Sequence, residues 1–278
     1  MFKPRLFSLL VLVSACSGMQ NSEEEKRKQQ NATGEFIYRR HNEIVYGIPP
    51  IERRLREKYP WEQAYIGAFP KITKEWFRCK GLDSHPPRIE KKGEGSPEYR
   101  YDCGGSRRHS LPLSGDDEFV YPILIELLNE VQARTKKQVI ITCGHRCPQH
   151  NLYADASPKA QASKHMIGAE VDFYVQGLEY QPEIILHYVM GYYKQSALYS
   201  GKKEFETFLR YDKGDLDVSI QPWYNKEVFI KLYTKNEGRD FDNQHPYPYI
   251  SIQVRFDRDQ GERVAYSWPK ANNGFKRY

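Results

Sequence analysis

Segments with helical periodicity and segments with strand periodicity follow one another irregularly in the second part of the chain, and this order constrains the fold most strongly. Apolar residues recur at three- and four-residue steps over 119–131, which predicts an amphipathic helix with one buried face. Asp116 and Asp117 precede it and suit the N-terminus of a helix. A second helix is predicted over 182–199, because proline at its start favours a first helical turn.

Strands are predicted over 138–142, 170–175, 227–234 and 249–256. In the last of these, apolar and polar residues alternate with the period of a half-buried strand. A turn at 257–261 predicts a hairpin that returns over 263–268. The irregular order of helices and strands favours an α+β fold in which helices flank a central antiparallel sheet.

The composition excludes several classes of protein. With 39% hydrophobic residues and a net charge of +6 over 278 residues, the chain can bury a core and is not dominated by disorder. Collagen-like, coiled-coil and multi-span membrane proteins are excluded on the same grounds. The positive excess is small and scattered, so no nucleic-acid partner is predicted.

The N-terminus predicts a targeting segment. A short basic region precedes an apolar run over 6–13, which is too short to span a bilayer. Small residues before Cys16 resemble the lipoprotein box of bacteria, so we expect 1–15 to be a signal peptide and Cys16 to be lipidated. By the same resemblance, Ser17 favours a lipid anchor at the periplasmic face of the outer membrane. The polar stretch 16–35 is expected to be a flexible tether.

Two further parts are expected beyond the tether. Residues 36–110 are rich in Tyr, Pro and Arg and show little periodicity, apart from a short helix predicted over 51–59. We expect an irregular N-terminal extension there. It would pack on a domain formed by 111–278, which carries the predicted sheet.

Four cysteines remain besides the one in the targeting segment. An exported protein meets an oxidising compartment, which favours disulfides. We expect Cys79 to pair with Cys103 across a loop rich in Gly and Pro, and Cys143 to pair with Cys147 within a tight turn. The alternative is a thiolate metal site at Cys143 and Cys147, for which a single C-x3-C spacing is weak support.

Two segments carry the residues best suited to chemistry. The segment 163–172 reads SKHMIGAEVD and resembles the S-x-H-x-x-G-x-x-x-D signature of the zinc D-alanyl-D-alanine carboxypeptidase-like peptidases. The segment 143–146 reads CGHR and resembles the S-G-Y-R segment of that family. The resemblance extends from about residue 119 to residue 255. It implies that family's fold, a zinc cofactor and peptidoglycan stem peptides as the substrate.

The residues of the signature support a metal site independently. His165 and Asp172 lie seven residues apart, so in a continuous strand they would be about 23 Å from each other. Both can reach one zinc ion only if the chain turns back between them, and Gly168 is suited to such a turn. Asp172 then falls in a buried strand, where a lone carboxylate is costly unless a cation compensates it.

Two alignments with the family give different residues at the position of the third zinc ligand. By resemblance it is a histidine near a late strand, and His245 supplies it in one alignment, with Asp242 as the general base. In the other alignment the corresponding positions fall on Ser251 and Gln253. Serine is a poor zinc ligand and glutamine cannot accept a proton, so this alignment leaves the site incomplete.

The resemblance also implies roles for other residues near the signature. Arg146 would bind a substrate carboxylate or the oxyanion that forms during hydrolysis. Ser163 and His145 would contact substrate in the cleft. Glu170 neighbours the zinc motif but is expected to point opposite to its strand neighbours, and it is given no catalytic role.

Two functions follow from these expectations. The first is a zinc-dependent peptidase that cleaves peptidoglycan stem peptides containing D-amino acids, as a D,D-carboxypeptidase or an endopeptidase. The second is a catalytically inactive relative that acts as a lipoprotein binding peptidoglycan or a protein. The position of the third ligand distinguishes them.

Overall fold

The computed structural model describes residues 25–26, 64–90, 96–155, 157, 161–214, 216–241 and 244–278. The predicted signal peptide, Cys16, the helix over 51–59, Asp242 and all of the tether except residues 25–26 lie outside the described residues. From residue 64 onward the described chain belongs to a single compact unit. Within the described ranges, no helix has the length and apolar character needed to cross a membrane.

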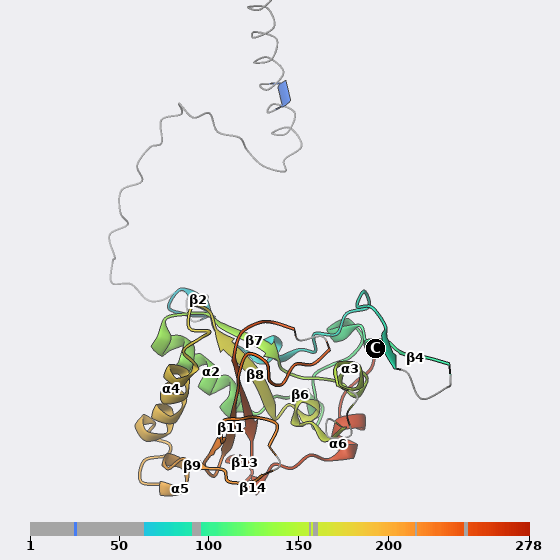
Figure 1. The fold of residues 1–278 in the computed structure, drawn as a ribbon. Helices are drawn as coiled ribbons and strands as arrows, with labels where there is room; N and C mark the ends of the chain where they lie inside the picture. Colours follow the sequence, from blue (N-terminus) through green and yellow to red (C-terminus); the bar gives the residue numbers. More distant parts are fainter. Residues whose placement is uncertain are drawn as a thin grey trace, which may run out of the picture. The chain divides into compact units, whose positions relative to one another are not determined.

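A six-stranded antiparallel sheet forms the centre of this unit, as predicted (Figure 1). Its spatial order is β7 (Val139–Cys143), β8 (Glu170–Val175), β12 (Tyr249–Val254), β11 (Val228–Tyr233), β10 (Trp223–Tyr224) and β9 (Leu209–Arg210). Every neighbouring pair is antiparallel. The four longest strands match the predicted segments to within one or two residues at most ends.

The two long helices pack against each other and against the sheet (Figure 1). They are α2 (Pro122–Thr135) and α4 (Pro182–Gln195), and each begins at the proline that favours a first turn. Leu124, Leu127 and Leu128 of α2 are fully buried. Each such side chain contributes about 1.5–3 kcal/mol to stability through the apolar surface it removes from water.

The alternation of side chains gives the sheet two different faces. Val171 and Phe173 of β8 and Ile250 and Ile252 of β12 are fully buried in the main core. The residues between them, Glu170, Asp172, Ser251 and Gln253, point to the opposite face because successive strand residues alternate. The apolar face therefore supports the core, and the polar face is free for chemistry.

Some local predictions were wrong. Asp117 does not begin a helix: β5 (Leu113–Ser114) and β6 (Asp117–Glu118) form a hairpin around Gly115, whose φ of +62° suits a tight turn. The late hairpin does form, but its strands β13 (Phe256–Asp257) and β14 (Glu262–Arg263) have only two residues each. The second long helix ends at Gln195, four residues before its predicted end.

The predicted N-terminal extension is built into the same core from residue 64 onward. Ile72 and Phe77 are buried among the core residues of the sheet and α2. Its elements are β1 (Tyr65–Ile66), β2 (Phe69–Pro70), η2 (Lys74–Phe77), β3 (Arg88–Glu90), β4 (Glu98–Arg100) and η3 (Gly105–Arg107). The remaining elements are α3 (Pro148–Ala154), η5 (Lys164–Ile167), α5 (Lys203–Glu206) and α6 (Trp268–Asn273).

Candidate metal centre and cleft

The turn before β8 brings the two residues of the signature together. Ser163 begins η5, and its hydroxyl oxygen accepts a hydrogen bond from the backbone N–H of His165 at 3.3 Å. Gly168 ends η5 with φ +69°, a conformation that side-chain-bearing residues rarely adopt. The chain then enters β8, where Asp172 lies. The predicted reversal at Gly168 is confirmed.

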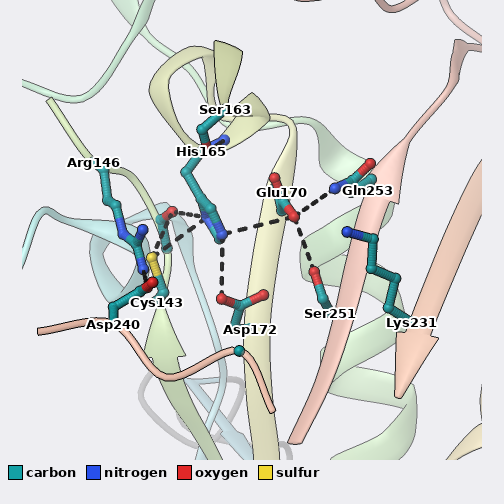
Figure 2. Close-up of polar contacts among 12 residues, drawn as sticks. Cys143, Arg146, Ser163, His165, Glu170, Asp172, Lys231, Asp240, Ser251 and Gln253 are labelled. Atoms are coloured by element: carbon teal, nitrogen blue, oxygen red, sulfur yellow. Dashed lines mark hydrogen bonds and ion pairs between the residues drawn. The ribbon is translucent and has the colours of Figure 1, made fainter. Parts of the chain in front are cut away.

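His165 and Asp172 are in direct contact (Figure 2). His165 Nε2 lies 3.2 Å from Asp172 Oδ2, and both residues are about 95% buried. His165 Nδ1 donates to the carbonyl oxygen of Gly144 at 2.6 Å, because a carbonyl can only accept. This bond orients the ring so that Nε2 faces the carboxylate.

Cys143, which was expected to form a disulfide with Cys147, lies beside His165 and Asp172 instead. One ligand atom from each of Cys143, His165 and Asp172 lies within 4.8 Å of the other two, and we call this set the cleft cluster. The Cys143 sulfur is 3.5 Å from His165 Nδ1. Asp172 Oδ1 is buried and has no hydrogen-bond partner among the described residues. These groups could hold a metal ion.

The charges of the cleft cluster are mutually stabilising. Burial alone lowers the pKa of His165, but the surrounding Cys143, Glu170 and Asp172 raise it well above the usual value. Burial likewise raises the pKa of Asp172, yet the adjacent His165 lowers it below its usual value. Without a metal, the pair is therefore an imidazolium and a carboxylate. A metal ion has to displace the His165 proton, which makes binding dependent on pH.

Glu170 faces the site, although sequence analysis gave it no catalytic role. Residues two apart on a strand share a face, so Glu170 lies beside Asp172. Its Oε1 is 3.8 Å from His165 Nε2. The same oxygen accepts hydrogen bonds from Ser251 Oγ at 3.0 Å and Gln253 Nε2 at 2.7 Å (Figure 2). The period of the strand was the signal that could have identified it.

The strand register places Ser251 opposite Asp172 and Gln253 opposite Glu170. These are the two positions at which the second alignment expected a histidine and an acid. In the described residues, several sets of three or more His, Cys, Asp or Glu side chains have ligand atoms within 4.8 Å of one another. His245 is in none of these sets. The structure thus places His245, the predicted third ligand, outside the cleft cluster.

His245 packs among aromatic rings instead. Its ring centroid lies 5.5 Å from those of Tyr174 and Tyr249. Burial lowers its pKa, so the imidazole is neutral near pH 7. The preceding Asp242, predicted as the general base, lies outside the described residues.

The cleft above the sheet has a volume of about 630 Å³ and is lined by charged side chains of both signs. Arg146 is 6% exposed and forms an ion pair with Asp240, and both residues line this cleft. Ser163 lines it as well. Lys231 also lines the cleft, on the strand next to Ser251.

His145 does not line the main cleft as predicted. It is 2% exposed and lines a separate cavity of about 210 Å³ together with Lys80 and His85. Its ring contacts those of His109 and Phe275, at centroid distances of 5.6 Å and 6.1 Å. Burial, followed by nearby positive charges, lowers its pKa well below the usual value.

The predicted disulfides are absent from the structure, in which Cys79, Cys103, Cys143 and Cys147 are free. The sulfurs of Cys79 and Cys103 are 3.6 Å apart, whereas a disulfide bond measures about 2.05 Å. Cys143 ends β7 and faces His165, while Cys147 begins α3 and points into a different cluster. The pairing of Cys143 with Cys147 is therefore corrected.

Comparison of the chain with family models, with curated proteins and with solved structures found no match. The chemistry of the site therefore rests on its own geometry. The nitrogen of His165 and the carboxylate of Asp172 converge at the polar cleft, with Arg146 and Glu170 beside them. The Cys143 sulfur lies behind them and lines the smaller cavity.

Proposed function

We propose that this chain is a zinc-dependent peptidase that cleaves peptidoglycan stem peptides containing D-amino acids, as a D,D-carboxypeptidase or an endopeptidase. The fold would be of the D-alanyl-D-alanine carboxypeptidase-like type. One observation carries the proposal: His165 and Asp172 converge next to Arg146 at the polar cleft, with Asp172 Oδ1 buried and unpartnered among the described residues.

The cleft cluster is chemically suited to zinc. Imidazole, thiolate and carboxylate are its common protein ligands, and catalytic sites use three of them with one open position. We assign His165, Asp172 and Cys143 as the ligands, with Cys143 in the place that sequence analysis gave to His245. When bound, zinc would lower the pKa of a coordinated water and polarise the scissile carbonyl.

The neighbouring residues suit the remaining roles. Glu170 lines the cleft, and its carboxylate is held by Ser251 and Gln253, so it can accept a proton from water and deliver it to the leaving amine. Arg146 can bind the terminal carboxylate of a stem peptide through paired N–H groups. Asp240 holds the guanidinium in the cleft before substrate arrives.

The proposed location agrees with this substrate. A lipid anchor at Cys16 would hold the protein at the periplasmic face of the outer membrane, within reach of the cell wall. The polar stretch after it would let the domain move over neighbouring stems.

Cleavage of defined stems tests the proposal. The full-length protein is incubated with a stem pentapeptide ending in D-Ala-D-Ala and with a cross-linked muropeptide, and products are identified by mass spectrometry. We expect cleavage by the wild type and by His187→Ala, an exposed control on α4. Cleavage should be lost in His165→Ala and Asp172→Asn. Absence of cleavage in the wild type with zinc present contradicts the proposal.

A second candidate is a catalytically inactive lipoprotein that binds stem peptides or a protein. The specific observation in its favour is that Ser251 and Gln253 occupy the register positions opposite the acidic pair and both donate to Glu170. In this case calorimetry should detect stem-peptide binding that Arg146→Ala weakens, although no stem is cleaved. The two functions therefore give different results in one set of samples.

A further inference from the structure

A second group of metal-ligand side chains lies outside the cleft. Three segments contribute to it: Cys79 follows η2, Cys103 and His109 flank η3, and Cys147 begins α3. Their ligand atoms all lie within 4.8 Å of one another, and the four residues are between 2% and 8% exposed. We call this set the four-ligand cluster.

The spacing of the donors matches a tetrahedral metal. The sulfurs of Cys79 and Cys103 are 3.6 Å apart, and Cys103 Sγ is 3.6 Å from His109 Nε2. Bonds of about 2.3 Å to sulfur and about 2.0 Å to nitrogen place neighbouring donors of tetrahedral zinc about 3.5–3.8 Å apart. We propose that Cys79, Cys103, His109 and Cys147 bind a structural zinc ion through three thiolates and one imidazole.

Hydrogen bonds orient three of the four donors for this role. His109 Nδ1 donates to the carbonyl oxygen of Ser110 at 3.0 Å, which leaves Nε2 with a free lone pair facing the sulfurs. The backbone N–H of Gly105 donates to Cys103 Sγ at 3.2 Å. The backbone N–H of His150 donates to Cys147 Sγ at 3.4 Å. Such N–H donors stabilise the negative charge of metal-bound thiolates.

Glycines allow the loops to close around the cluster. A Cβ atom at Gly81 would lie 2.3 Å from Cys103 Sγ, and one at Gly105 would lie 2.1 Å from the Gly81 carbonyl oxygen. Gly105 also has φ +75°, which favours glycine. The two loops can approach each other this closely only because these positions lack side chains.

A neighbouring group, Asp102 with Cys103 and His150, shares one cysteine but is not a metal site of its own. Its carboxylate already accepts hydrogen bonds from the backbone N–H groups of Leu82 and Cys103, and it contacts one ring nitrogen each of His85 and His150. Asp102 therefore positions the loops that carry the ligands. The sulfur of Cys103 belongs to the larger set.

The role of this ion would be structural, because four protein ligands leave no position for water. It would join loops that are far apart in sequence and fix Cys147, the residue directly after Arg146. The inference does not depend on the proposed peptidase activity.

The test measures metal in the full-length protein by mass spectrometry of the element. We expect about one zinc per chain to remain in His165→Ala, which removes a cleft ligand. His109→Ala should contain about one zinc fewer than the wild type, because any ion in the cleft is unaffected. His109→Cys should retain zinc because a site of four cysteines also binds it. His187→Ala is the matched control. Cobalt substituted for zinc in His165→Ala, in which the cleft site lacks its imidazole, should still give a sulfur-to-metal charge-transfer band.

The His109→Cys variant keeps the proposal falsifiable if His109→Ala does not fold. Equal zinc content in the wild type and in His109→Ala overturns the proposal. A wild-type chain without zinc, lighter by two hydrogens because Cys79 and Cys103 are joined, overturns it as well. Failure of stem cleavage leaves these readings unchanged, so the two proposals can fail separately.

Discussion

The cleft cluster and the four-ligand cluster lie at the two ends of the short segment from Cys143 to Cys147, yet their donors and surroundings differ. The four-ligand cluster has three sulfurs and one nitrogen and is enclosed by glycine-containing loops. The cleft cluster has one sulfur, one nitrogen and one carboxylate, and His165 and Asp172 line a cleft of about 630 Å³. A closed set of four ligands is typical of a structural metal, and an open set of three is typical of a catalytic one.

The difference shows how one chain can separate stability from reactivity. In the enclosed site, Cys103 and Cys147 accept backbone N–H groups. In the cleft, His165 also contacts the ionisable side chains of Asp172 and Glu170. Loss of a donor should therefore reduce stability at the first site and chemistry at the second.

The largest difference should appear between two cysteine variants. Cys103→Ser should lower the free energy of unfolding by about 3–5 kcal/mol, because a structural metal contributes directly to folding. Cys143→Ser should lower it by about 1 kcal/mol, while weakening metal binding at the cleft. Urea unfolding followed by circular dichroism in zinc-containing buffer measures both. Equal losses would remove the distinction between the sites.

The next effect concerns the carboxylate beside the cleft cluster. Glu170→Gln should reduce the rate of stem cleavage by about 10²–10³-fold, because glutamine cannot act as a general base. The zinc content should stay the same. Glu183→Gln, an exposed change on α4, is the control. Loss of zinc in Glu170→Gln would instead make this residue a ligand.

A smaller effect is expected at the cleft arginine. Arg146→Lys keeps the charge but removes the paired N–H geometry, so kcat/KM should fall by about 10–100-fold. The fall should be larger for stems with a free terminal carboxylate than for amidated stems. Arg134→Lys on α2 serves as the control. Equal falls on both stems would assign Arg146 to the oxyanion rather than to the substrate terminus.

The smallest effect is a pH dependence next to the four-ligand cluster. Burial raises the pKa of Asp102, but its hydrogen bond to His150, together with the bonds from Leu82 and Cys103, lowers it below the usual value. Ionised Asp102 therefore stabilises the fold above the unfolded pKa of about 3.9, and this contribution is lost as pH falls toward the folded pKa.

Asp102→Asn should accordingly cost about 1–3 kcal/mol at pH 7, because buried donors lose a charged acceptor. The cost should shrink below about pH 4, because the unfolded wild type then binds a proton at Asp102 that the folded carboxylate, with its lowered pKa, does not yet bind. Urea unfolding at several pH values measures it. A cost that does not change between about pH 7 and about pH 3 would mean that the charge is unimportant.

The periodic segments of the sequence predicted the fold well because their signals are local. The strand over 170–175 was predicted with its observed bounds, and the turn at Gly168 followed from the need to join His165 to Asp172. The same strand period could have placed Glu170 in the cleft. Asp117 was misread, because an acidic residue suits either a helix start or a hairpin, and the turn at Gly115 decided between them.

The metal-ligand sets could not be derived in this way because they depend on tertiary contacts. Cys147 joins residues that precede it by 38 to 68 positions, whereas the pairing with Cys143 was inferred from nearness in sequence. His245 was assigned by resemblance, but its tilted ring contact with Tyr174 is visible only once the strands are aligned. Sequence analysis considered Cys143 as a metal ligand only together with Cys147, and its place beside His165 is visible only once β7 and η5 are packed together.

The end of the chain is fastened to the segment that carries His109. Ser110 and Leu113 donate backbone N–H groups to the carbonyls of Lys276 and Gly274, and Tyr278 donates to Arg108. An affinity tag fused after Tyr278 would therefore start from a hydrogen-bonded residue. It could disturb the segment that carries His109 of the four-ligand cluster. A long glycine-rich spacer, or a tag inserted in the surface loop at Gly201, is the better engineering choice for producing this protein.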